Sequence, residues 1–220
     1  MRDSGRHARA VAALIALAVA SRAAAQVPGS PVLQNAFANP GLAVAANVTG
    51  GGGQSFFGAA AGYGMGSGRL QLSGAAGVQR ASSATRGAYG ARLSATAWTS
   101  AGQGLAVGAF AGFGGAARTR NAADSVTNPA VVIVPVGLTV GYRRSIGATR
   151  GISVYGSPLY RWTRAEATTV STSGKFGGAA GLDVALTQSF GATIGAAFGA
   201  GGSGSSSTTF GLALSFVPGR

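Results

Sequence analysis

The sequence predicts an all-β protein, a single antiparallel up-and-down transmembrane β-barrel of about ten strands, with about eight or twelve as alternatives. Three observations support this fold class. Glycine makes up 39 of the 220 residues, and each glycine disfavours a helix interior by about 1 kcal/mol. The mean hydropathy is nevertheless +0.30, which is too apolar for a disordered linker. From residue 41 onward, apolar side chains recur at every second position, the period of a strand with two unlike faces.

The alternating segments define the predicted strands. They are residues 41–49, 56–65, 69–79, 88–98, 105–114, 131–143, 152–163, 175–186, 190–199 and 208–216. Their apolar face carries no Asp, Glu, Lys or Arg, whereas the other face holds charged, polar and small residues. Apolar-out and polar-in alternation is what a lipid-facing barrel requires. The alternative, a secreted soluble β-sandwich binding module, would place its polar face outward and would need far more surface charge.

The links between these segments suggest two unlike barrel ends. Residues 80–87, 115–129 and 165–174 are predicted to be long loops, which mostly alternate with short turns. Aromatic residues on the apolar face gather near the segment ends, as in the interfacial girdles of membrane barrels. Pro135 and Pro158 lie inside adjacent segments, where each deletes a ladder hydrogen bond, so we expect a bulge or a local opening there.

The start of the chain is predicted to be a cleaved secretory signal peptide. A basic opening with Arg2, Arg6 and Arg9 is followed by an apolar run and then by three alanines, which places cleavage before Gln26. The apolar run is shorter than the roughly 20 residues that a membrane-spanning helix needs. The predicted organisation is a signal peptide at 1–25, an irregular lead-in at 26–40, the barrel at 41–216 and a tail at 217–220.

The end of the last predicted strand carries a recognisable motif. Thr209, Gly211, Leu214 and Phe216 give the order polar, glycine, apolar, aromatic. This order resembles the β-signal by which bacterial outer-membrane barrels are recognised by the barrel assembly machinery. The resemblance is to the small outer-membrane barrel class at large and covers residues 41–216. It implies location in the cell outer membrane, with membrane lipid, lipopolysaccharide and the assembly machinery as partners.

The residues needed for most enzyme chemistry are missing from the predicted mature chain. Cysteine is absent, and the only histidine, His7, lies in the predicted signal peptide. Asp124 and Glu166 fall in predicted loops, and Asp183 stands alone on the inward face, so no paired carboxylates are expected. We therefore predict a protein that is not an enzyme, with no catalytic residue, no metal site and no cofactor.

Charge is distributed in a way that argues against nucleic-acid binding. The formal net charge is +13, but the arginines are scattered singly and are not interleaved with stacking aromatics. One group is predicted to point into the barrel and to form a lumen charge cluster. It comprises Arg69, Arg92, Arg143, Arg161, Lys175 and Asp183. Asp183, predicted to lie near Thr193, would either fix the barrel through a salt bridge or form a charged constriction that selects solutes.

Two functions stay open at this point, a narrow porin-like channel with anion preference and a membrane-stabilising or surface-interaction protein. Inward glycines such as Gly58, Gly112 and Gly181 would leave room for a thin water path. Large side chains expected on the inward face would obstruct it. They are Phe56, Trp98, Phe110, Tyr155 and Leu159.

A second group of arginines is predicted in or beside the outer loops. It comprises Arg80, Arg86, Arg118, Arg120 and Arg164. These side chains either are simply solvated or dock the phosphates of lipopolysaccharide, for which the planar guanidinium is suited.

Overall fold

The computed structural model describes residues 41–51, 53–66, 69–81, 84–102, 104–120, 126–147, 150–199 and 208–218. The predicted signal peptide at 1–25, the lead-in at 26–40 and Asp124 lie outside these residues. Within the described part, no helix is long and apolar enough to cross a membrane.

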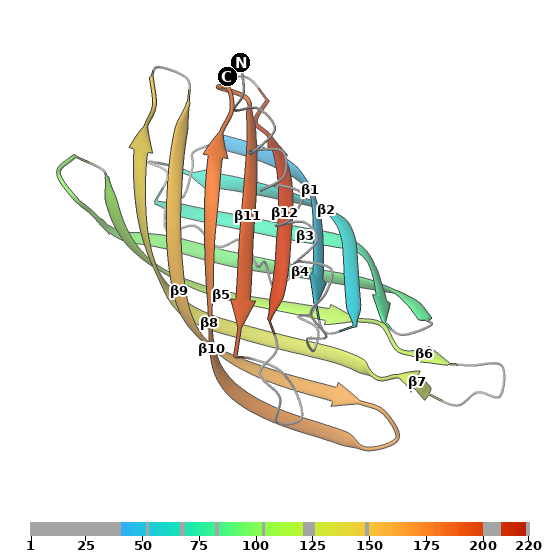
Figure 1. The fold of residues 1–220 in the computed structure, drawn as a ribbon. Coiled ribbons are helices and arrows are strands. Elements are labelled where there is room, and N and C mark those ends of the chain that lie inside the picture. Colours follow the sequence, from blue (N-terminus) through green and yellow to red (C-terminus); the bar gives the residue numbers. More distant parts are fainter. Residues whose placement is uncertain are drawn as a thin grey trace, which may run out of the picture.

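In the described chain, ten strands form one closed antiparallel barrel (Figure 1). They are β1 (Gly41–Gly51), β2 (Gln54–Met65), β3 (Leu70–Ala81), β4 (Ala84–Thr99), β5 (Leu105–Ala116), β8 (Ala130–Ser145), β9 (Gly151–Glu166), β10 (Val170–Ala185), β11 (Phe190–Phe198) and β12 (Thr209–Phe216). Pairing of β1 with β12 closes the sheet. The short strands β6 (Thr119–Arg120) and β7 (Val126–Asn128) form a separate hairpin between β5 and β8. The predicted fold class is confirmed.

The two faces of the sheet are the reverse of those in a water-soluble protein. Large apolar side chains point outward and are exposed, as Leu72 (53 %), Leu138 (57 %) and Leu214 (60 %) illustrate. Polar side chains such as Gln79 and Thr139 point inward and are buried. The period-two pattern therefore places apolar residues outside because successive side chains of a strand face opposite ways.

The two ends of the barrel differ in a way that corrects part of the sequence prediction. Residues 80–87 and 165–174 are not long loops, because β3, β4, β9 and β10 continue through them and leave only residues 82–83 and 167–169 as links. We call this the extended end. At the opposite, short-turn end, the links are residues 66–69, 100–104, 146–150 and 186–189.

Strand length explains the protruding extended end. Strands β4, β8, β9 and β10 each have 16 residues. At about 3.3 Å per residue and a tilt of about 40°, such a strand rises about 40 Å along the barrel axis. An apolar band is only about 25 Å tall, so these strands continue beyond it. The β9–β10 hairpin extends past its neighbours in the lower part of Figure 1, and β10 pairs with β11 only from Gly178 onward.

The two prolines interrupt the ladder as expected, as local openings without a register shift. Between β5 and β8, the pairs Ala111–Val136 and Gly114–Ile133 flank a gap that contains Pro135. Between β8 and β9, pairing lapses between Gly137–Leu159 and Val140–Gly156, where Pro158 lies. Each proline lacks an N–H, so each falls at a place where the ladder omits a bond.

A β-bulge in β4 reverses one inward prediction. The ladder with β5 pairs Thr96 with Gly108 and then Trp98 with Val107, so Ala97 is the extra residue. The bulge turns Trp98 to the outer face, where it is 54 % exposed. The expectation of an inward Trp98 was therefore wrong, because one inserted residue inverts the alternation that follows it. Trp98 joins the aromatic residues of the short-turn end.

Candidate functional site: the barrel interior and its two rims

One charged group lies in the half of the interior toward the short-turn end. Arg92 is buried, donates a 2.7 Å hydrogen bond from Nε to Ser94 Oγ, and places its guanidinium carbon 5.1 Å from the centre of the Phe110 ring. The negative charge of Asp183 acts on Arg92. The ladder sets Asp183 opposite Thr193, as predicted from the sequence. Arg92 and Asp183 are thus within electrostatic reach of each other on the inner face. A salt bridge between them that fixes the barrel stays a prediction.

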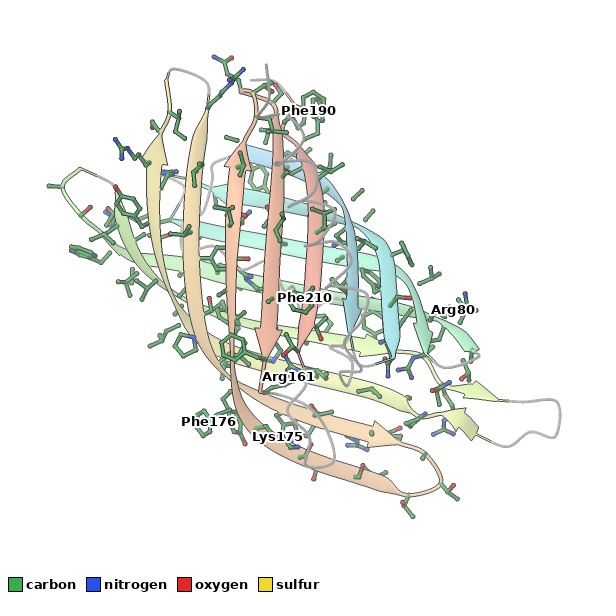
Figure 2. The ribbon with its side chains drawn as sticks, in the orientation of Figure 1. Arg80, Arg161, Lys175, Phe176, Phe190 and Phe210 are labelled. Carbon is green, nitrogen blue, oxygen red and sulfur yellow. The ribbon has the colours of Figure 1, made fainter. Side chains whose placement is uncertain are left out.

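Among the other predicted lumen charges, Arg143 lies level with Asp183, because Ser153 is paired with Arg143 on one side and with Asp183 on the other. Arg161 and Lys175 lie away from Asp183. Arg161 is 5 % exposed and is paired in the ladder with Lys175 (Figure 2). Lys175 stands eight positions from Asp183 along β10, about 26 Å at 3.3 Å per residue. Arg143 is half-buried near the short-turn end, opposite Ser153. Arg69 lies in the turn before β3 and is exposed, so it does not line the lumen as predicted.

Arg86 occupies a different place from the one predicted for it. Because β4 begins at Ala84, Arg86 is a strand residue with its side chain pointing inward and 7 % exposed. Its Nε donates to Gln79 Oε1 and its Nη1 to Pro129 O, both at 2.7 Å. Gln79 Nε2 in turn donates to Gln54 Oε1 at 2.5 Å. The network joins three strands to the residue before β8, so Arg86 is not available for lipopolysaccharide.

Aromatic rings cover two of the glycines that were expected to leave open space, Gly58 under Phe56 and Gly181 under Tyr155, and further inward glycines as well. Phe56 lies over Gly58 and Gly77, where the ring would collide with any added Cβ atom. Phe110 covers Gly137 in the same way, with ring carbons at 2.7 and 2.8 Å from such an atom. The glycines of the inner face thus provide room for rings on neighbouring strands, a form of aromatic rescue. The inference of a water path from inward glycine is not supported at these positions.

The middle of the interior is packed with small and aromatic side chains. Phe110 and Leu159 form one buried cluster with Ala179 and Ala197. Further inward side chains that are at most 5 % exposed come from several strands. They are Phe56, Ala106, Thr139, Ser153, Tyr155, Ser157 and Ala213. These inward side chains are therefore closely packed against their neighbours.

The arginines of the extended end are spread over two sides of the barrel. Arg80 of β3 and Arg164 of β9 are exposed and stand on the outward face. Arg80 follows outward Val78, which pairs with Phe57 of β2, and Arg164 follows Trp162. Arg164 forms a 2.7 Å salt bridge with Glu166, and Arg118 donates to Glu166 O at 3.1 Å. The side chain of Arg120 lies outside the described residues.

Outward charge at the short-turn rim was missed by the sequence analysis. The predicted strand ended at residue 143, but β8 continues to Ser145, and Arg144 is exposed on the outward face. Alternation from Tyr142 would have predicted its direction, had the strand been extended by one residue. The apolar outer surface thus lies between arginines at its two ends. Arg80 and Arg164 stand at the extended end, and Arg144 stands at the short-turn end.

The last strand, β12, forms the seam of the barrel. Thr209 and Gly211 face inward and are buried, whereas Leu214 and Phe216 face outward. The Phe216 ring lies 5.0 Å from that of Phe190, centre to centre, at the short-turn rim. Val217 N–H donates to Ser189 O at 2.8 Å, which ties the chain after β12 to the last turn. The residues that resemble the β-signal are thus divided between both faces of β12.

The described residues hold no group of three or more His, Cys, Asp and Glu side chains that could bind a metal ion. Their two carboxylates lie toward opposite ends, with Glu166 at the extended end and Asp183 in the interior. This arrangement does not bring two acids together for general acid–base catalysis.

No protein-family model and no curated protein matches the sequence. Among solved structures, the N-terminal β-barrel domain of Pseudomonas aeruginosa OprF is similar to this chain with a TM-score of 0.37 and 11 % sequence identity. The match covers 80 % of this chain and 95 % of that domain.

Proposed function

We propose that this protein is an integral outer-membrane β-barrel whose interior is closed to solutes, and that it stabilises the membrane and presents a surface to it. One observation carries the proposal, the apolar outer surface bounded by outward arginines at both rims. A charge at the bilayer midplane costs roughly 2–4 kcal/mol in a membrane barrel. An outer surface with apolar residues in its middle and charged residues at its rims has the pattern expected for contact with lipid.

The soluble alternative is not supported by the fold. A β-sandwich consists of two sheets packed face to face, whereas the ten long strands form one closed sheet. Its outward residues include Phe57, Leu138 and Phe176, all more than half exposed. Such a surface in water would be an apolar patch far larger than soluble monomers tolerate.

Membrane insertion is tested by heat-modifiability and fractionation. Unheated protein should migrate faster than boiled protein on a detergent gel, and the protein should remain with the outer-membrane fraction. Recovery in the soluble periplasm would refute the proposal.

The closed interior is tested separately by conductance. We expect refolded protein in planar bilayers to give no single-channel current, because Phe110 and Leu159 fill the middle of the barrel. Replacing both by alanine should open a narrow path with anion preference, since Arg92, Arg161 and Lys175 line the inner face against Asp183. Steady current from the unaltered protein would refute closure and favour the narrow anion channel.

The proposed orientation places the extended end outside the cell. Lipopolysaccharide phosphates would then contact Arg80, Arg118 and Arg164, while assembly would proceed through recognition of β12. Support comes from Arg80 and Arg164, two exposed arginines that stand on the outward face at the end of the apolar residues of their strands. Replacing Arg80 and Arg164 by glutamine should weaken lipopolysaccharide retention on the purified barrel. Unchanged retention would leave these arginines as solvated rim residues and refute this part.

A further inference from the structure

A groove lies on the outer surface at the short-turn end, between the last residues of β8 and the first residues of β9. It has a volume of about 630 Å³ and is lined by Tyr142, Arg144, Ser145, Ile146, Ile152 and Val154. The ladder brings these residues together, because it pairs Tyr142 with Val154 and Arg144 with Ile152.

The groove is amphipathic, with its polarity ordered along the barrel axis. Toward the middle of the barrel, its wall is formed by Val154 and the Tyr142 ring, both nearly half exposed. At the rim stands Arg144, which is exposed. Ile146 is 52 % exposed and begins the turn, in which its N–H donates to Arg150 O at 2.8 Å. An occupant must therefore present an apolar part toward the middle of the membrane and a polar head at the rim.

The charge of the rim selects the kind of head group. Arg144 and Arg150 are both exposed at this turn. The two described carboxylates are elsewhere, because Glu166 lies at the extended end and Asp183 belongs to the inner face. A guanidinium matches the geometry of a phosphate and can donate two parallel hydrogen bonds to it. The complementary head group is thus a phosphate with a net negative charge.

We infer that this groove binds one anionic phospholipid of the short-turn leaflet, with its phosphate on Arg144 and an acyl chain along Tyr142, Ile152 and Val154. This inference rests on the proposed function, since it requires the barrel to span a membrane. Under the proposed orientation, the groove faces the leaflet opposite the one that holds lipopolysaccharide. The bound lipid is therefore a diacyl phospholipid, with phosphatidylglycerol as its simplest anionic form.

Native mass spectrometry of the detergent-solubilised barrel, titrated with phosphatidylglycerol or with phosphatidylcholine, measures this binding directly. We expect one phosphatidylglycerol to be retained in preference to phosphatidylcholine, and Arg144→Gln to weaken that retention about tenfold, or about 1.4 kcal/mol. Arg69→Gln is the matched control, because Arg69 is also an exposed arginine of the short-turn end but lies in the turn before β3 and does not line the groove. Ile146→Ser should weaken retention of both lipids, because it removes an apolar side chain from the groove wall at an exposed turn position.

The outcomes separate this inference from the proposed function. Equal retention by Arg144→Gln and the unaltered protein would overturn the groove site, as would equal weakening by Arg69→Gln, which would show attraction to net charge alone. Either result would leave insertion intact, which the gel shift of each variant reports independently. A barrel that fails to insert at all would instead overturn the proposed function, and the groove site with it.

Discussion

Removal of the Arg86 side chain should cost the barrel a large part of its stability. The guanidinium donates to Gln79 Oε1 and to Pro129 O, each at 2.7 Å, while Arg86 is 7 % and Gln79 1 % exposed. A hydrogen bond from a charged donor contributes about 1.5–3 kcal/mol. Arg86→Ala removes two of them and leaves the Gln79 oxygen buried without this donor. The substitution also removes the cost of burying the guanidinium charge, which offsets part of the loss. We therefore expect a decrease of about 3–5 kcal/mol in the free energy of unfolding.

The measurement is equilibrium unfolding of refolded protein in detergent micelles, with guanidinium as denaturant and tryptophan fluorescence as the signal. Arg80→Ala is the matched control, because Arg80 is exposed on the outer face of the neighbouring strand. Its effect should stay within about 0.5 kcal/mol. Arg86→Lys should recover part of the loss by restoring one donor. If Arg86→Ala fell within about 1 kcal/mol of Arg80→Ala, the network would not stabilise the barrel and the reasoning would be refuted.

Three further predictions concern the seam, the glycines and the bulge. Phe216→Asp should deplete the protein from the outer membrane without blocking export, as measured by fractionation, because it alters the assembly motif; normal insertion would make the resemblance accidental. Gly137→Ala should destabilise by about 1–3 kcal/mol, since the new Cβ would meet a ring and a carbonyl oxygen. Gly156→Ala, with nothing within 4 Å of the added atom, should cost nothing in the same unfolding assay, and equal effects would contradict the role of the covering ring. Trp98, kept as the single tryptophan by Trp162→Phe, should be quenched by brominated phospholipids in vesicles; an unquenched signal would place it inside the barrel.

The alternation of apolar residues was sufficient to predict the barrel, because lipid outside and polar side chains inside impose a period of two on every strand. The predicted starts and ends of β5, β11 and β12 lie within two residues of the observed ones. The errors lie where alternation continues without strongly apolar residues. Arg86 was placed in a loop because residues 84–87 carry no large apolar side chain, although the strand pairs through them with β3.

Other features depend on contacts that a single sequence does not reveal. No sequence pattern identifies the bulge at Ala97. The prediction that Trp98 points inward could therefore not be corrected before the register was known. The glycines under Phe56 and Phe110 resemble open space until the rings of neighbouring strands are placed over them. Whether Arg92 lies near Asp183 is likewise set by how the closed sheet curves, which the strand pattern leaves undetermined.

The seam between β1 and β12 has a consequence for the order of folding. Its register pairs run from Val44–Phe216 to Gly50–Phe210, so it joins the two ends of the barrel sequence. Most other pairings join strands that follow one another directly. Closing a loop of about 170 residues costs roughly 4–5 kcal/mol in chain entropy by the logarithmic rule. We therefore expect neighbouring hairpins to form before the circle closes, with the seam as the final step and as the place where unfolding begins.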